Sequence, residues 1–366
     1  MIEILDPKSD SLRIHQLLQP NCGMRFVDGW ESARAELAAI DAFGSGSMDW
    51  GDDRVIENSS RYVVYPWRST VVRLPSDEHF YRLRTARNRY LIDEDEQSKW
   101  GSALIGVAGL SVGASVVSVC ALTGTRRFRI ADPDTLGPSN LNRLQGSVCD
   151  LGVSKVTLVQ RRLLEADPYT DVSAYSSGYA SHDDSFLGSA PGMERLAVLA
   201  EEMDDLALKV VVRQRAREVG IPVVMATDNG DNVILDVERY DRDPDYPLFH
   251  GRAGDLTEMA VSELNDPANR LRIANAIVGG DVTPRTRYSM TQVGRSLPSW
   301  PQLGTAATTA GSSAALAARL IVCGADIESG RYRVDLDRIL LGEAASSACR
   351  WNELDESAFV VLMAER

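Results

Sequence analysis

The chain has 366 residues and a formal net charge of −13 at pH 7. Apolar residues make up 44% and charged residues 25%, proportions that are ordinary for a globular protein with a sizeable core. The acidic balance argues against nonspecific binding to nucleic acid or to anionic membranes, because both require a basic surface. No apolar run approaches the length of a membrane span, and the N-terminus lacks a signal-peptide pattern, so we expect a cytoplasmic protein.

The cysteines indicate reduced thiols and no zinc site. None of the five belongs to a C-x-x-C pair, and the four histidines are scattered without metal-ligand spacing.

Residues 1–85 are predicted to form a small accessory region of α+β structure. Its expected elements are helices over 11–18 and 31–40, a glycine- and acid-rich loop over 41–53, and two short strands over 61–74 that are broken at Pro66. Residues 76–100 have a helical pattern with interspersed arginines.

A nucleotide-binding βαβ unit is predicted between residues 103 and 143. An apolar run over 103–108 is typical of a buried strand, and the small-residue turn from Gly109 to Gly113 follows it. A small apolar helix and a second strand then lead to Asp132, where a carboxylate can either accept both ribose hydroxyls or merely cap the strand. The glycine spacing differs from the G-x-G-x-x-G fingerprint, so the turn alone does not identify the nucleotide.

The later elements favour an α/β fold with a doubly wound, mainly parallel Rossmann-like sheet and a small N-terminal α+β extension. Strands and helices alternate, and the expected elements are a helix over 153–165, strands over 172–175 and 196–200, a helix over 206–219, a strand over 221–226, a closely packing small-residue helix over 303–323 and a strand over 331–339. We expect the nucleotide-binding domain to span 86–345, with an irregular crossover or substrate loop at 227–301 and a C-terminal tail at 346–366.

Side chains beyond Asp132 favour a nucleoside triphosphate over a dinucleotide. Asp134 is followed by Asn140 and Arg143, and a triphosphate needs such amide and guanidinium donors more than a pyrophosphate does. Lys155 begins a predicted helix, where the helix dipole disfavours a cation unless it serves an anion. Asp204 and Asp205 follow an apolar strand at the same predicted edge, where a carboxylate can hold Mg²⁺ on the phosphates.

The order of these features resembles the ThiF/MoeB/HesA family, bacterial relatives of the ubiquitin-activating enzymes. The family's D-x-D-T-x-x-x-S-N-L-x-R segment corresponds to residues 132–143, and its lysine in a G-x-x-K-V context corresponds to Lys155. Its glycine turn corresponds to 109–113, its T-D-N segment to 203–205, and its Asn-Arg pair before the first strand to Asn88 and Arg89. The similarity covers roughly residues 87–339, and parts of it also resemble an actinobacterial branch that is often fused to a nitroreductase-like domain.

The resemblance implies a ThiF-like adenylyltransferase that uses ATP and Mg²⁺ to form an acyl-adenylate on a carboxylate and releases pyrophosphate. It implies a homodimer in which Arg89 reaches the partner's ATP, with Asp132 on the ribose and Asp204 on Mg²⁺ or the γ-phosphate. The implied catalytic residues are Arg89, Arg143, Lys155 and Asp204. The implied nucleotide-binding residues are Gly109, Ser111, Gly113, Asp132, Asp134, Asn140 and Asp205.

Three departures from the family pattern affect the expected chemistry. Ser111 stands where the family usually has glycine, the paired zinc cysteines are absent, and residues 227–301 contain no cysteine. We therefore expect no covalent cysteine step, and a small-molecule carboxylate is favoured over a peptide or the C-terminus of a ubiquitin-like protein. Two alternatives stay open: an NAD(P)-dependent oxidoreductase, and a non-catalytic nucleotide-binding scaffold with a degenerate fold.

Overall fold

The computed structural model of the chain describes residues 1–43, 58–277, 279, 282–342, 359 and 361. These residues fall into two compact units. The N-terminal unit comprises Met1–Ser98, Leu122–Gly124 and Arg161–Thr170, and the larger unit comprises the remainder. Most of the predicted loop at 41–53 and nearly all of the predicted tail at 346–366 lie outside the described residues.

The N-terminal unit is built on a four-stranded sheet with the order β1-β3-β4-β2. Its elements are β1 (Glu3–Leu5), α1 (Ser11–Leu17), β2 (Arg25–Asp28), α2 (Trp30–Asp41), β3 (Ser60–Tyr65), η1 (Pro66–Arg68), β4 (Thr70–Pro75), α4 (Asp77–Thr85), η2 (Ala86–Asn88) and α5 (Glu94–Ser102), which continues into the larger unit. The two strands predicted on either side of Pro66 are confirmed, because β3 and β4 pair antiparallel around η1. The predicted helix over 76–100 is interrupted between η2 and α5.

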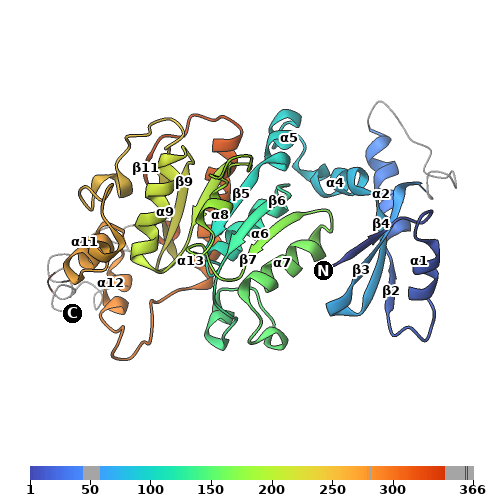
Figure 1. Cartoon of the computed structure of the whole chain (residues 1–366), viewed down its shortest axis with the longest axis horizontal. Coiled ribbons are helices and arrows are strands. Elements are labelled where there is room, and N and C mark those ends of the chain that lie inside the picture. Colours follow the sequence, from blue (N-terminus) through green and yellow to red (C-terminus); the bar gives the residue numbers. More distant parts are fainter. Residues whose placement is uncertain (44–57, 278, 280–281, 343–358, 360, 362–366) are drawn as a thin grey trace. The chain divides into compact units, whose positions relative to one another are not determined.

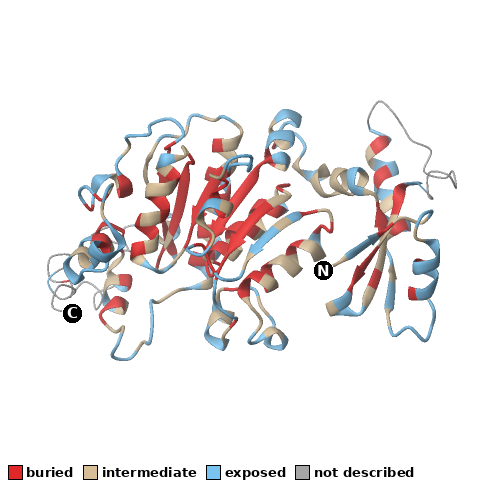
Figure 2. Cartoon of the chain, in the orientation of Figure 1, coloured by how far each residue is buried: buried red, intermediate tan, exposed pale blue. Residues whose placement is uncertain are grey.

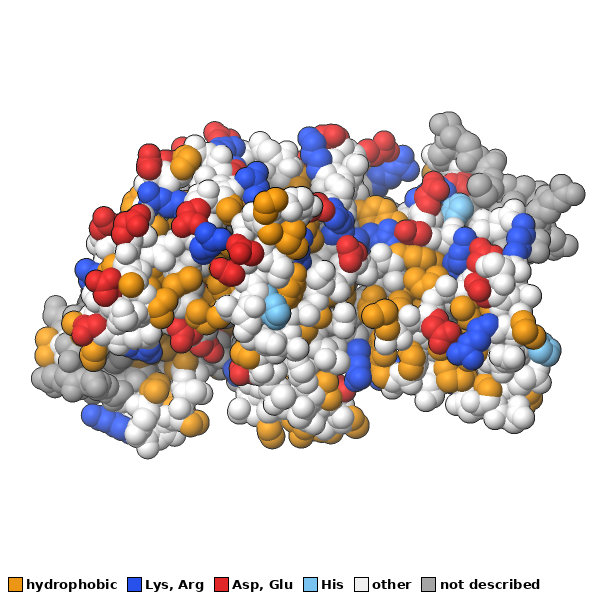
Figure 3. All heavy atoms as spheres, in the orientation of Figure 1, with side chains coloured by type: hydrophobic (Ala, Val, Ile, Leu, Met, Phe, Trp, Pro, Cys, Tyr) orange, Lys and Arg blue, Asp and Glu red, His pale blue; other side chains and the backbone are white. Residues whose placement is uncertain are grey.

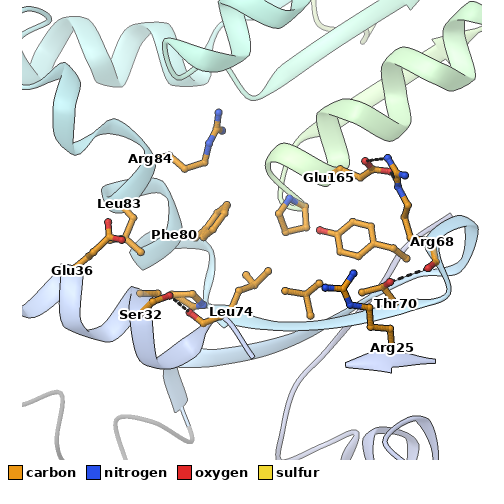
Figure 4. A pocket seen from close by; sticks show the side chains of 16 residues that line it. Arg25, Ser32, Glu36, Arg68, Thr70, Leu74, Phe80, Leu83, Arg84 and Glu165 are labelled. Atoms are coloured by element: carbon orange, nitrogen blue, oxygen red, sulfur yellow. Dashed lines mark hydrogen bonds and ion pairs between the residues drawn. The ribbon is translucent and has the colours of Figure 1, made fainter. Parts of the chain in front are cut away.

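Alternation along β3 and β4 sends apolar side chains to both faces of this sheet. Val64 and Val71 pack with α1, whereas Val63 and Leu74 face the opposite side together with Phe80 of α4. A groove of about 860 Å³ lies on this second side. Figure 4 shows Leu74 and Phe80 in the groove and the Arg68–Glu165 ion pair at one side of it.

The larger unit contains a sheet whose seven strands in the described part of the chain have the order β11-β10-β9-β8-β5-β6-β7 (Figure 1). The five strands from β9 to β7 are parallel, and β10 and β11 are antiparallel additions at one side. The strand bounds are β5 Leu104–Ala108, β6 Arg127–Ala131, β7 Asp171–Tyr175, β8 Val198–Glu201, β9 Val223–Asn229, β10 Asn232–Glu238 and β11 Gly330–Val334. The predicted α/β, mainly parallel Rossmann-like fold is confirmed.

Helices cover both faces of this sheet, as Figure 1 shows. They and the 3-10 turns are α6 Gly113–Leu122, η3 Pro138–Asn142, η4 Val148–Asp150, α7 Lys155–Ala166, α8 Asp183–Leu187, α9 Leu206–Glu218, η5 Leu248–Gly251, α10 Val261–Leu264, α11 Pro267–Ile277, α12 Pro284–Met290, α13 Gly304–Val322 and α14 Leu336–Leu341. The predicted close packing of the small-residue helix is confirmed, since a Cβ at Gly311 of α13 would lie 2.5 Å from Ser115 Cβ of α6. The central strands are fully buried between these layers (Figure 2).

The region predicted to be an irregular loop at 227–301 differs most from expectation. It contains the whole of β10, all seven residues of which are buried, and the helices α10 to α12. β10 was hidden in the sequence because Asp236 and Glu238 interrupt its apolar pattern. The predicted strand at 331–339 is shorter, since β11 ends at Val334 and α14 follows.

None of the helices in the described ranges is long and apolar enough to cross a membrane. On the face that Figure 3 shows, acidic and basic side chains are interspersed and no broad basic patch is visible.

Candidate nucleotide-binding site

The site lies at the carboxyl ends of β5, β6, β8 and β9, where ligands bind in open parallel sheets. Gly109 directly follows β5 and has φ +89, which favours glycine. A Cβ at this position would lie 2.3 Å from the carbonyl oxygen of Glu202, so the main chain after β8 presses directly against the turn. A Cβ at Gly113 would lie 2.8 Å from Val107, which places the start of α6 close to β5. Gly109 therefore allows a close approach of two main-chain segments, and Gly113 leaves room for the Val107 side chain.

Asp132 braces this turn from the end of β6. One carboxylate oxygen accepts the main-chain N–H of Leu110 at 2.6 Å, and the other accepts that of Asp134 at 2.8 Å. Burial raises the pKa of Asp132, against the opposing effects of the Leu110 N–H and the Lys155 charge. Each oxygen retains a lone pair, so this bracing is compatible with the predicted contact to ribose.

Lys155, the first residue of α7, reaches back to the same turn. Its Nζ lies 2.8 Å from a carboxylate oxygen of Asp134 and 3.6 Å from one of Asp132. The lysine and Asp132 side chains are only 7% and 5% exposed, whereas Asp134 is 66% exposed. The protein itself thus supplies carboxylates that balance the charge of a lysine at this helix start.

Arg143 follows η3, and hydrogen bonds hold two of the three nitrogens of its guanidinium group. Its Nε–H donates to the hydroxyl of Ser111 at 2.8 Å, and Nη1 donates to Ser139 and Asn142. Its Nη2 has no hydrogen-bond partner among the described residues. Because Ser111 lies just before α6, a fixed cation and the positive end of a helix dipole occur together, an arrangement that suits a phosphate group.

Two of the sequence-predicted residues make local structural contacts instead of pointing to a common centre. The Asn140 side chain accepts the main-chain N–H of Gly137 within η3. Asp205 caps α9, because its carboxylate accepts the N–H of Leu208 at 2.9 Å. Asp204, by contrast, is exposed at the end of β8, and its charge acts on Arg143.

Arg89 lies in the N-terminal unit, at the end of η2. Its guanidinium group is 49% exposed, lies 3.6 Å from Glu94 and stacks on the Tyr90 ring. Tyr90 and Leu91 beside it are 89% and 83% exposed, and Tyr90 has φ +68.

A buried ionic network supports the turn after β8. Arg213 of α9 is fully buried and donates to both Glu201 and Glu238, and Lys209 lies 3.1 Å from Glu201. Burial raises the pKa of Glu201, but the charges of Lys209 and Arg213 outweigh burial and leave it lowered. The neighbouring Glu202 lacks such a pair, and burial raises its pKa well above the ordinary value.

Asp228 is the site residue that the sequence did not reveal. It is the penultimate residue of β9, is 4% exposed, and neither carboxylate oxygen accepts a hydrogen bond from a described residue. Burial raises its pKa to about 7, against the Arg143 charge and the Gln302 side chain, while the Asp204 charge raises it further. The only sequence signal was its position directly after an apolar strand.

The fold is a Rossmann-like α/β fold, and this edge of its sheet is a candidate nucleotide-binding site. A model of the ThiF family matches residues 85–326, and the chain belongs to that family. An uncharacterized protein of Mycobacterium tuberculosis, MT1398, is 33% identical over 342 residues, which are 93% of this chain and 46% of that protein. The tRNA threonylcarbamoyladenosine dehydratase 2 of Saccharomyces cerevisiae is 27% identical over 150 residues, 40% of this chain and 33% of that protein. The chain thus spans less than half the length of these curated relatives.

Several solved structures are similar in fold. E. coli MccB has a TM-score of 0.45 and 15% identity, covering 65% of this chain and 64% of that chain. The E. coli tRNA N6-threonylcarbamoyladenosine dehydratase TcdA has a TM-score of 0.47 and 17% identity, covering 68% and 97%. PaaA has a TM-score of 0.49 and 14% identity, covering 71% and 83%.

Proposed function

We propose that the chain is an ATP-dependent adenylating enzyme that activates a carboxylate and releases pyrophosphate. Membership of the ThiF family supports this reaction class. The observation that carries the proposal is Arg143, whose guanidinium group is fixed through Ser111 and has a nitrogen without a partner among the described residues. A guanidinium group held in this way can stabilise the charge that develops when a carboxylate displaces pyrophosphate from the α-phosphate.

The remaining residues support the same reaction. Lys155 forms an ion pair with Asp134. It can exchange this partner for a phosphate, because Asp134 is exposed to solvent and does not need the pair. Asp204 is an exposed oxygen ligand at the same edge, and Mg²⁺ is commonly bound by one or two carboxylates together with substrate phosphates. The described residues contain no group of three or more metal-ligating side chains, so phosphates would complete the coordination of the cation.

We propose that no covalent cysteine step occurs. Cys120 is fully buried, and Cys22 lies in the N-terminal unit. Cys149 and Cys323 are the described thiols of the larger unit that are at least partly exposed, and neither is among the residues that form the nucleotide site. The substrate on this proposal is a small-molecule or peptide carboxylate, or the C-terminus of a ubiquitin-like protein.

We also propose a homodimer in which Arg89 acts on the partner's ATP. The exposed apolar side chains of Tyr90 and Leu91 suit burial against another subunit. Two inactive variants, Arg89→Ala and Arg143→Ala, should partly restore activity when mixed, because mixed dimers contain one intact site. If mixing restores nothing although the dimers exchange subunits, Arg89 does not act in trans.

The test of the main proposal is ATP–pyrophosphate exchange with a panel of carboxylates, together with calorimetric titration of ATP. Arg143→Ala should lower exchange by about 100-fold or more, as removal of one charge-stabilising donor commonly does. Arg333→Ala, which removes an exposed guanidinium group from β11, is the matched control. Tight binding of NADH without ATP binding would instead support an oxidoreductase, and ATP binding without exchange on any carboxylate would support a non-catalytic scaffold.

A further inference from the structure

The Asp228 carboxylate is unusual because it is buried, unbonded and located at a ligand-binding edge. Buried carboxylates in folded proteins nearly always accept hydrogen bonds or pair with cations. A buried carboxylate without such contacts therefore indicates that a ligand completes them. Both of its oxygens are buried, and neither accepts a hydrogen bond of ordinary geometry from a described residue, although the Gln302 side chain is close enough to lower the pKa of the carboxyl group. Arg143 acts on it only through its charge, because no ion pair within 4 Å joins the two side chains.

The position of Asp228 in the sheet indicates what that partner is. β9 and β8 are parallel neighbours, so Asp228 at the end of β9 and Asp204 just after β8 share one edge. The charge of each carboxylate acts on Arg143, and that of Asp204 also acts on Asp228. Two neighbouring carboxylates repel one another when both are ionised, unless a cation binds between them. A guanidinium group that must also bind phosphates cannot compensate both of them.

We propose that Asp228 is a second carboxylate for the divalent cation of ATP and acts together with Asp204. This inference rests on the proposed ATP-dependent function and adds a ligand from β9. Mg²⁺ accepts one or two carboxylates besides phosphate oxygens and water, so the pair matches its known ligand chemistry. The side chain of Gln302 acts on the same carboxyl group, and a cation that binds Asp228 takes the place of that amide.

The experiment measures metal binding directly, with Mn²⁺ as the probe in electron paramagnetic resonance titrations. The intact chain is saturated with α,β-methylene ATP, and Mn²⁺ is titrated into wild type, Asp228→Asn, Asp204→Asn and Asp326→Asn. Asp326 is 88% exposed and pairs with Arg242, so its variant controls for the loss of a carboxylate elsewhere. Asp228→Asn and Asp204→Asn should each weaken Mn²⁺ binding by on the order of tenfold or more, and Asp326→Asn should not.

A second titration, of the nucleotide into metal-free protein in EDTA, separates a metal ligand from a mere negative charge. Asp228→Asn should bind the nucleotide as tightly as wild type or more tightly there, because a negative charge near the phosphates is removed. Unchanged Mn²⁺ affinity in Asp228→Asn, while wild type binds nucleotide and catalyses exchange, overturns this inference alone. If wild type binds no nucleotide at all, the proposed function and this inference both fail. Circular dichroism of each variant verifies that it is folded.

Discussion

The Nε–H of Arg143 donates a 2.8 Å hydrogen bond to the hydroxyl of Ser111, a side chain in the turn before α6. Ser111 is the residue that departs from the glycine usual in the ThiF family. The departure therefore has a defined structural consequence. Ser111 holds the guanidinium group of Arg143, on which the proposed catalysis depends most.

Ser111→Ala should weaken ATP binding because Arg143 loses one of its fixed contacts. A hydrogen bond to a charged group contributes about 1.5–3 kcal/mol, and part of that is regained because the half-buried Arg143 can bind water. We expect the dissociation constant for ATP, measured by calorimetry, to rise by about 3- to 10-fold. Ser312→Ala, whose hydroxyl bonds within α13, is the control. Unchanged ATP affinity in Ser111→Ala would show that Ser139 and Asn142 suffice to hold Arg143.

Asp228→Asn should stabilise the metal-free and nucleotide-free protein, and more at pH 8 than at pH 5. The folded-state pKa of Asp228 is raised from 3.8 to about 7. The unfolded chain therefore ionises this carboxyl first, and the folded state loses stability as pH rises through the interval between the two values. At about 1.4 kcal/mol per pKa unit, the penalty at pH 8 is on the order of 4 kcal/mol. Urea unfolding in EDTA at both pH values measures it, and an equal gain at both would contradict the assignment.

Lys155→Met should destabilise the fold far more than Asp134→Asn. Removing Lys155 leaves Asp132 buried without a cation, and breaking a buried pair in this way costs about 3–5 kcal/mol. Asp134 is 66% exposed, so losing its side of the pair should cost less than about 1 kcal/mol. The comparison is made by urea unfolding at pH 7. Similar losses in the two variants would mean that the exposed Lys155–Asp134 contact, and not the buried Asp132, dominates.

Gly109→Ala should abolish the close approach of the turn to the end of β8. Two effects add here: the left-handed φ of +89 and the 2.3 Å contact of a Cβ with the Glu202 carbonyl oxygen. Gly152→Ala is a matched control, because Gly152 has φ +82 and nothing within 4 Å of a Cβ. We expect Gly152→Ala to cost about 1 kcal/mol and Gly109→Ala clearly more, with loss of ATP binding. Equal thermal stability of the two variants would show that the close approach to Glu202 is not the reason for a glycine at position 109.

The local chemistry of the βαβ unit was predictable from sequence. Short apolar runs, a small-residue turn and Asp132 at a strand end are spaced within 30 residues, so chain connectivity alone brings them together. The motif that ends in Arg143 is also one continuous segment, so its resemblance to the ThiF family could be seen in the sequence. Strand β5 lies within the expected range of 103–108, and α6 and β6 follow in the expected order.

What only the tertiary structure decided concerns residues whose partners are distant in the chain. β10 carries Asp236 and Glu238, whose charges look incompatible with a buried strand until Arg331 and Arg213 pair with them. The bond from Ser111 to Arg143 and the orphaned carboxylate of Asp228 likewise depend on which strands lie side by side. Sequence periodicity reports which face of an element is apolar, but the cost of burying a charge depends on the group that folding places opposite it.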